Sequence, residues 1–214
     1  MTSSPLFTRR SSLLVMGGAT AALALPGVAL AKPQVGIAAP TFSGLGSDGK
    51  PYKLADYRGK TVVLEWTNHE CPYVNKHYRS NNMQTLQKDS AAKGIVWLTV
   101  ISSMPESQGY VSAAQANDLT KARNAAPVAV LLDPDGVIGR AYDARVTPHM
   151  FVIDPKGTLV YMGGIDSIRS TSLDDVPKAT PYVKDALRQL AAGEKIGNAM
   201  TQAYGCTIKY KPTA

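Results

Sequence analysis

The sequence predicts a single α/β domain with a largely parallel central β-sheet flanked by helices, and two patterns favour this fold class. Short, continuous apolar runs rich in valine, leucine and isoleucine recur along the chain, and such runs are typical of strands that are covered on both faces. Segments with helical character separate these runs. Strands that alternate with helices indicate an α/β architecture.

The first 31 residues are expected to be a targeting segment rather than part of this fold. Residues 8–14 (TRRSSLL) match a twin-arginine pattern, a run of apolar and small residues follows, and residues 29–31 (ALA) fit a signal-peptidase site. A membrane anchor is the alternative, but glycines and a proline interrupt the run and no basic flank follows it. The sequence thus predicts cleavage after Ala31, a periplasmic location reached by the twin-arginine route, and no membrane attachment after cleavage.

The remaining chain is long enough for one domain with a full core and too short for two ordinary ones. We assign residues 32–192 to the domain and residues 193–214 to a C-terminal tail that docks on it. The whole chain holds 23 lysines and arginines against 16 aspartates and glutamates, but the basic residues are scattered and no aromatic residues alternate with them. This distribution indicates a solvated surface and argues against nucleic-acid binding.

The elements on the amino-terminal side lead to one apolar strand. Residues 37–61 resemble a small hairpin with its turn at Asp48-Gly49, followed by a short turn before the strand. The strand covers residues 62–66. Cys71-Pro72 comes next, and residues 73–92 predict one helix with the proline in its first turn, where its missing N–H is not needed.

Strands and helices then alternate along the chain. We expect a strand at 95–101, a helix at 110–125, a strand at 128–132 and one or two helical turns at 137–142. The last part comprises a strand at 146–154 with a proline at its entrance, a strand at 158–162, a surface loop at 166–179 and a closing helix at 181–192. Thr180 as N-cap, Pro181 at the first helical position and Gly193 after the end delimit the closing helix.

Cys71 is the residue best placed for chemistry. It lies just before or at a predicted helix N-terminus, where unpaired backbone N–H groups and the helix dipole stabilise a thiolate. The alternative is a cysteine that is merely a small buried apolar residue. The order of strand, loop, Cys-Pro and helix favours a reactive thiol.

Residues 61–78 resemble the active-site segment of the thioredoxin-like superfamily, in the branch that contains redoxins, peroxiredoxin-like and AhpC/TSA-type proteins. Residues 37–61, with Pro-x-Phe, Asp-Gly-Lys and Leu-x-Asp-Tyr-x-Gly-Lys, extend the resemblance to the start of a redoxin domain. The resemblance implies a thioredoxin-like fold with a central mixed β-sheet flanked by helices. It also implies that Cys71 matches the first cysteine of the thioredoxin Cys-x-x-Cys motif. Glu65 then matches the buried aspartate that moves protons to and from the thiols.

The chain departs from the family pattern in two ways. Val74 stands at the position of the second Cys-x-x-Cys cysteine, which is also where peroxiredoxins carry their peroxide-reacting cysteine. The peroxiredoxin pattern Pro-x-x-x-Thr-x-x-Cys is absent, since Asn68 lies three residues before Cys71. The family name alone therefore does not transfer peroxidase chemistry to this chain.

A second matching segment surrounds Thr147-Pro148. The resemblance implies that this pair contains a cis peptide next to Cys71, and that the Thr147 backbone is free to pair with an extended substrate. Three further residues are expected at the binding site because of their places beside the two matching segments: Pro72, His69 and His149. A protonated His69 would favour the thiolate form of Cys71 whereas Glu70 would oppose it, so the sequence does not give the sign of their net effect.

We expect an exported thiol-dependent oxidoreductase in which Cys71 is the redox-active nucleophile. Its substrate would be a peroxide or a disulfide, its electron donor a thiol, and no cofactor is expected. Glu65, if buried, would accept and return the thiol proton; the alternative is a strand residue that faces water. Cys206, the second of two cysteines, either resolves the oxidised Cys71 or forms a structural disulfide with it, and sequence separation does not decide between these.

Two other functions stay open. One is a copper or other metal-binding module of this fold, since His69, Cys71, His77 and His149 offer ligand atoms, although the loop contains no second cysteine. The other is a non-catalytic scaffold with a permanent Cys71–Cys206 disulfide. Stoichiometric metal uptake tests the first function, and the reducibility of the disulfide tests the second.

Overall fold

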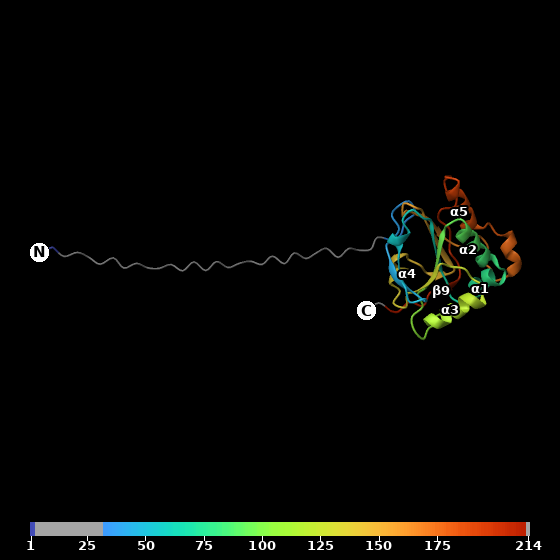
Figure 1. The fold of residues 1–214 in the computed structure, drawn as a ribbon, viewed down its shortest axis with the longest axis horizontal. Coiled ribbons are helices and arrows are strands. Elements are labelled where there is room, and N and C mark those ends of the chain that lie inside the picture. The colour runs from blue at the N-terminus through green and yellow to red at the C-terminus, as the bar shows by residue number, and fades with distance from the viewer. Residues whose placement is uncertain (3–31, 213–214) are drawn as a thin grey trace. The chain divides into compact units, whose positions relative to one another are not determined.

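The computed structural model describes residues 1–2 and 32–212, and Figure 1 shows the fold. Apart from its first two residues, the predicted targeting segment lies outside the described part, so its cleavage and its export route stay predictions. The described residues from 32 to 212 belong to one compact unit. Within the described residues, no helix is both long and apolar enough to cross a membrane.

A seven-stranded sheet in the order β2-β1-β5-β4-β3-β7-β8 forms the centre of the domain, and a separate two-stranded sheet joins β6 to β9. β4 pairs in parallel with β3 and β5, whereas the other pairs are antiparallel. This arrangement confirms the predicted central mixed sheet. The strands are β1 (Ser43–Gly46), β2 (Pro51–Lys53), β3 (Val62–Trp66), β4 (Val96–Ile101), β5 (Ala129–Leu132), β6 (Val146–Thr147), β7 (His149–Ile153), β8 (Leu159–Gly163) and β9 (Cys206–Thr207).

Helices flank the sheet on both faces (Figure 1). Helices α1, α2, α3 and α5 pack on one face, and α4 packs on the other. The helices are α1 (Pro72–Arg79), α2 (Asn82–Ala92), α3 (Ala113–Ala122), α4 (Val137–Ala141) and α5 (Tyr182–Ala191), together with the short 3-10 helices η1 (Leu54–Tyr57) and η2 (Leu173–Lys178).

The alternation of side chains along β3 separates two cores. Leu64 and Trp66 point into the core on the α4 side, whereas Val63 points into the core under α1, α2 and α5. Glu65 follows Val63 in this alternation, and all five residues of β3 are buried. The acidic residue of the central strand therefore lies in the interior, on the face that carries α1.

The prediction of one helix over residues 73–92 is wrong. Asn81 adopts a left-handed backbone conformation, with φ 60° and ψ 10°, and separates α1 from α2. Asparagine reaches this conformation more readily than most residues, because its short polar side chain bonds locally. Across the break, Gln84 Nε2 donates to Tyr78 O at 2.9 Å. Helix α1 is therefore only eight residues long.

Other elements also differ from the predicted ones. The strand predicted at 146–154 is divided at Pro148 into β6 and β7, which belong to different sheets. Helix α5 begins at Tyr182 because Pro181 has a non-helical backbone and occupies the N-cap position, so Thr180 is not the cap. Helix α3 begins at Ala113, since Ser112 forms a reciprocal capping box with Gln115. The expected loop at 166–179 contains η2.

The C-terminal tail packs along the domain. Tyr204 and Ile208 are 5% and 6% exposed. Tyr204 enters the core on the α1 side and Ile208 the core on the α4 side. Between them β9 pairs antiparallel with β6, so that Cys206 stands opposite Thr147. The tail thus carries the second cysteine to the strand that precedes Pro148.

Candidate active site

Cys71 occupies the N-cap position of α1, and Pro72 is the first residue of the helix. The Cys71 side chain is completely buried. Its thiol donates a hydrogen bond to Thr147 O at 3.1 Å. The structure therefore brings together the helix N-terminus, the thiol and the segment before Pro148, which lie far apart in the sequence.

Contacts from α3 and from the loop before it hold the turn that presents Cys71. Arg123 donates to His69 O at 3.0 Å. Gly109 N donates to Glu70 Oε2 at 2.7 Å. These two contacts hold in place the two residues that precede the cysteine.

Cys206 is the sulfur neighbour of Cys71. Both cysteines are free thiols in this structure, and Cys206 is partly exposed whereas Cys71 is not. Burial raises the pKa of Cys206 to about 12, and the neighbouring Cys71 acts in the same direction. Thr147 contacts both cysteines, since it pairs with Cys206 and its carbonyl oxygen accepts the hydrogen bond of the Cys71 thiol.

The Thr147-Pro148 peptide is cis, as the resemblance implies. However, the expectation that the Thr147 backbone is free is wrong. It pairs with Cys206 in the β6–β9 sheet, and its carbonyl also accepts the hydrogen bond from Cys71. Gly205 permits this close approach, since a Cβ there would lie 1.8 Å from Thr147 O. The chain's own tail occupies the edge that we expected an extended substrate to use.

Glu65 is fully buried and accepts four hydrogen bonds. Burial raises its pKa, whereas the hydrogen bonds and the charge of Arg123 oppose this shift. In the described part of the chain, no hydrogen bond joins Glu65 to Cys71. The donors to Glu65 are Tyr78 Oη at 2.9 Å, Trp97 Nε1 at 2.8 Å, Gln87 Nε2 at 3.1 Å and Thr99 Oγ1 at 3.3 Å.

The sequence did not predict these four donors. Two of them could have been found from the strands, because parallel pairing places Glu65 opposite Thr99, and Trp97, two residues earlier, lies on the same side of β4. Tyr78 and Gln87 come from two helices separated by the unpredicted break. No local pattern indicated that both helices turn a polar side chain toward β3.

The two histidines expected at the site take different positions. His69 is partly buried, and this burial lowers its pKa. The ring of His149 packs against Phe151, with centroids 4.5 Å apart, and burial lowers its pKa to about 4. Phe151 belongs to the core on the α4 side, whereas Cys71 belongs to the core on the other side of the sheet. His149 therefore packs on the side of the sheet opposite to Cys71. Because its pKa is lowered, the His149 ring is neutral near pH 7.

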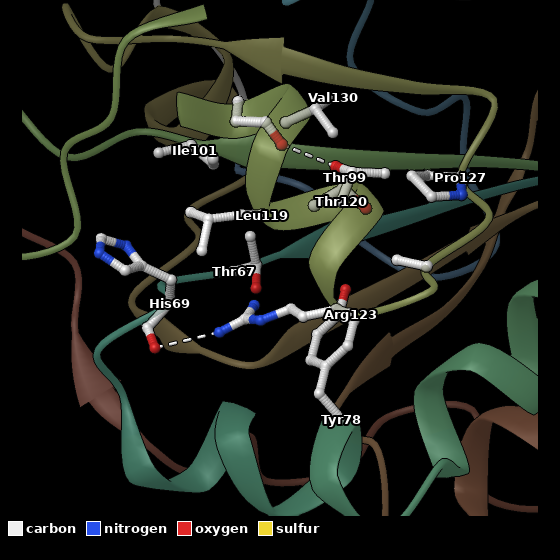
Figure 2. Close-up of a pocket in the computed structure, with 12 residues that line it drawn as sticks. Thr67, His69, Tyr78, Thr99, Ile101, Leu119, Thr120, Arg123, Pro127 and Val130 are labelled. Carbon is white, nitrogen blue, oxygen red and sulfur yellow. Dashed lines mark hydrogen bonds between the residues drawn. The ribbon is translucent and has the colours of Figure 1, made fainter. Parts of the chain in front are cut away.

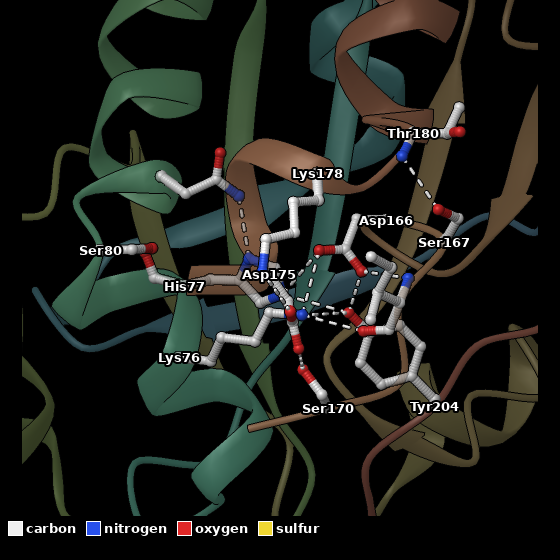
Figure 3. Close-up of polar contacts among 12 residues, drawn as sticks. Lys76, His77, Ser80, Asp166, Ser167, Ser170, Asp175, Lys178, Thr180 and Tyr204 are labelled. Atoms are coloured by element: carbon white, nitrogen blue, oxygen red, sulfur yellow. Dashed lines mark hydrogen bonds and ion pairs between the residues drawn. The ribbon is translucent and has the colours of Figure 1, made fainter. Parts of the chain in front are cut away.

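A buried charged cluster joins α1, the segment after β8 and the tail (Figure 3). Lys76 Nζ lies 3.2 Å from Asp166 Oδ2. Tyr204 donates to Asp166 Oδ1, and the Tyr204 hydroxyl lies 3.3 Å from His77 Nε2. Burial lowers the pKa of His77 to about 4, so the ring is neutral near pH 7. We call these four residues the Lys76 cluster. Because Tyr204 is two residues before Cys206, the cluster anchors the tail beside Cys71.

The four residues considered as metal ligands are not gathered at one place. His77 bonds within the Lys76 cluster, and its Nδ1 lies 2.9 Å from Asn82 Nδ2. His149 Nδ1 accepts from Arg145 N at 3.4 Å. Among residues 1–2 and 32–212, no three His, Cys, Asp or Glu side chains are grouped so that they could hold a metal ion.

The fold and the site together define a thioredoxin-like protein with one cysteine at the start of α1 and a second supplied by the tail. The AhpC/TSA family model matches residues 35–162, which is more than half of the chain. The chain therefore belongs to the AhpC/TSA family. No curated protein matches it.

Several solved structures share this fold. An uncharacterized conserved protein from Geobacillus kaustophilus is 26% identical, with a TM-score of 0.75 over 85% of this chain and 94% of that one. A hypothetical protein from Sinorhizobium meliloti 1021 is 20% identical, with a TM-score of 0.72 over 86% and 98% of the two chains. A putative thiol:disulfide interchange protein DsbE from Chlorobium tepidum is 22% identical, with a TM-score of 0.52 over 76% and 98%. These likenesses confirm the thioredoxin-like fold.

Proposed function

We propose that this protein is a thiol-dependent oxidoreductase that cycles between a Cys71/Cys206 dithiol and an internal disulfide. The observation that most directly supports this proposal is the pairing of Cys206 with Thr147, whose carbonyl oxygen also accepts the hydrogen bond of the Cys71 thiol. Membership of the AhpC/TSA family supports a redoxin-type function. The name of the Chlorobium tepidum relative fits a thiol–disulfide reaction.

In the first step, Cys71 as thiolate attacks the oxidant. A peroxide transfers one oxygen atom, which leaves a sulfenic acid on Cys71 and releases an alcohol or water. A disulfide instead forms a mixed disulfide with Cys71 and releases one thiol. Glu65 exchanges the proton of the Cys71 thiol in either case. Cys71 is the nucleophile because it stands at the N-terminus of α1, whereas burial raises the pKa of Cys206 and favours its protonated form.

In the second step, Cys206 loses its proton and attacks Cys71 Sγ. This step forms the internal disulfide and releases water from the sulfenic acid, or the second thiol from the mixed disulfide. A thiol electron donor then supplies the two electrons that restore the dithiol. The partly exposed Cys206 gives that donor a sulfur to attack.

The test compares wild type, Cys71→Ser and Cys206→Ser after reduction and treatment with hydrogen peroxide or with a disulfide. Mass spectrometry after thiol alkylation reads the products. We expect an internal disulfide in wild type, a sulfenic acid or mixed disulfide that persists on Cys71 in Cys206→Ser, and no reaction in Cys71→Ser. A native disulfide that thiol reductants open only after unfolding would instead identify a structural bond.

We also propose that the protein acts outside the cytoplasm, because residues 8–14 and 29–31 follow the pattern of a twin-arginine signal. A reporter fused to residues 1–31 tests this. Export that is lost when both arginines become lysines supports the route, and export that is unaffected excludes it.

A further inference from the structure

Glu65 and its hydrogen-bond donors are all enclosed by the protein. The four donors are between 0% and 7% exposed. The proposed function, on which this inference rests, has Glu65 take up and release a proton, and a buried carboxyl group reaches its protonation equilibrium only if protons can pass between it and solvent. The donors differ in their ability to relay it. A hydroxyl group both donates and accepts, whereas the amide N–H of Gln87 and the indole N–H of Trp97 only donate to the carboxylate.

A cavity between α3 and the sheet touches both hydroxyl donors of Glu65 (Figure 2). Tyr78 and Thr99 form part of its wall, but Gln87 and Trp97 do not. The residues that can pass a proton on are thus the ones that meet the cavity. The rest of the wall includes the polar residues Thr67, His69 and Arg123.

Two polar atoms at this wall, Thr67 Oγ1 and His69 Nδ1, have no hydrogen-bond partner among the described residues. Thr67 is 7% exposed, and a buried hydroxyl group without a partner is unfavourable unless water or a ligand pairs with it. The space open to the centre of a water molecule measures about 30 Å³, and about 10–15 Å³ suffices for one water. The cavity therefore has the size and the polarity for one or two water molecules.

We propose that this cavity is a water site that carries protons between Glu65 and solvent. Water bonded to Thr67 Oγ1 and His69 Nδ1 meets the hydroxyl groups of Thr99 and Tyr78. Protonated Glu65 donates to one of these hydroxyls, that hydroxyl donates to the water, and the water passes a proton outward. One proton leaves Glu65, one proton enters the solvent, and only O–H bonds exchange. Uptake follows the same steps in reverse.

His69 lies at the outer end of this route. His69 and Leu119 also line a second hollow on the outer side of α3, together with Gln115 and Asp118. Gln115 and Asp118 are exposed, so this second hollow is in contact with solvent. Arg123 holds the His69 backbone through the hydrogen bond to its carbonyl. His69 therefore lines both the inner cavity and the outer hollow, and its backbone is held in place.

The first test is the direct observation of water in the wild-type protein. A high-resolution crystal structure, supported by NMR transfer between long-lived water and the Thr67 and Thr99 side chains, is expected to show water within hydrogen-bond distance of Thr67 Oγ1 and His69 Nδ1. A dry cavity would overturn the proposal.

The second test measures the exchange of the Glu65 carboxyl proton for deuterium, followed through the infrared band of the protonated acid. Thr67→Val keeps the shape of the side chain but removes the hydroxyl that binds the water. Thr120→Val is the matched control, because Thr120 lines the same cavity but its hydroxyl already donates to Ala116 O at 2.8 Å within its own helix and so does not need the water. We expect exchange to slow about tenfold or more in Thr67→Val, and to stay within about twofold in Thr120→Val.

Thr67→Ser retains the hydroxyl group and is expected to restore the wild-type exchange rate. Equal exchange rates in Thr67→Val and Thr120→Val would contradict the route. If Thr67→Val does not fold, a slow rate in Thr67→Ser contradicts it as well, because the serine hydroxyl can bind the same water.

Neither test needs a reactive Cys71, and both can be repeated in Cys71→Ser. A hydrated cavity with fast exchange in a protein whose thiols do not react with oxidants would leave the water site intact and exclude the proposed function. A dry cavity in a protein that forms the Cys71–Cys206 disulfide would exclude the water site alone.

Discussion

Cys206 and Glu65 show how the protein interior changes the acidity of single side chains. Burial raises the pKa of both groups, so both favour their protonated forms. Cys71 is buried as well, stands at a helix N-terminus and donates a hydrogen bond to a carbonyl oxygen. The site therefore combines a thiol at a helix N-terminus with a second thiol and a buried acid that both favour their protonated forms.

Glu65→Gln is expected to slow the oxidation of Cys71 by roughly 100-fold, since general acid–base groups contribute about that much or more. The variant should also lose a pH dependence of stability. The pKa of Glu65 is raised in the folded state. As the pH rises from about 4.3, the unfolded-state value, through the folded-state value, the unfolded chain releases a proton that the folded chain keeps. The free energy of unfolding of wild type therefore falls across this range, and that of the variant does not.

Urea unfolding at a series of pH values measures this difference. Asp89→Asn is the matched control, because it removes an exposed acid from α2. The control should follow the pH dependence of wild type. A Glu65→Gln curve parallel to wild type would show that Glu65 does not titrate with a raised pKa.

Tyr204→Phe tests the Lys76 cluster. The variant keeps the ring that packs edge-on against Tyr73, with centroids 5.7 Å apart, but removes the hydroxyl that donates to Asp166. A buried hydrogen bond to a charged group contributes about 1.5–3 kcal/mol, so we expect unfolding at lower urea and slower closure of the Cys71–Cys206 disulfide. Tyr110→Phe at an exposed position, 39% exposed, is the control. Disulfide closure at the wild-type rate in Tyr204→Phe would argue against the anchoring role.

At the scale of elements, the site lies where one helix begins and two short strands meet. β6 and β9 have two residues each, and a pair of this size is not stable alone. The Lys76 cluster on one side and the buried Ile208 on the other hold it in place. The position of Cys206 therefore depends on the whole tail rather than on β9 alone.

Gly205→Ala is expected to separate β9 from β6. Its Cβ would lie 1.8 Å from Thr147 O, and the φ of 142° at this position is unfavourable for a side chain. The alkylation of Cys71 in the reduced native protein should then become about tenfold faster or more, because the covering strand is displaced. Rates of thiol alkylation by a small reagent measure this.

Gly197→Ala is the matched control in the same tail, since a Cβ there would meet only Gln189 Nε2, at 3.8 Å. It should leave the alkylation rate unchanged. An equally slow reaction in Gly205→Ala would show that β9 does not cover Cys71.

At the scale of the whole molecule, the tail returns the end of the chain to its first β-α connection. A disulfide between Cys71 and Cys206 closes a loop that contains most of the domain, and loop closure of that length stabilises a protein by about 4–5 kcal/mol in the chain-entropy treatment. We expect the oxidised protein to unfold at higher urea concentration than the reduced protein. The Cys71→Ser/Cys206→Ser double variant should show no dependence on redox state. Equal stability of the two redox forms of wild type would mean that the bond is strained.

Local patterns determined the features that depend on neighbouring residues. The apolar runs predicted the strands because a buried strand needs apolar side chains on both faces, and the Cys71-Pro72 pair marked the start of α1 because proline fits the first turn. The family resemblance added the cis peptide at Pro148 and a buried Glu65, and the structure agrees with both. The single helix over 73–92 failed because one left-handed residue, Asn81, has no clear signal in sequence.

Only the tertiary structure decided how distant segments meet. The pairing of Thr147 with Cys206 and the burial of Lys76 against Asp166 join parts of the chain that are far apart. The cavity beside Glu65 likewise takes its walls from β4, β5, α1, α3 and the loop after β3. Such contacts depend on the packing of whole elements against one another, and packing is not encoded in any short stretch of residues. The sequence by itself determined which cysteine stands at the helix N-terminus, and the fold decided that the tail covers it.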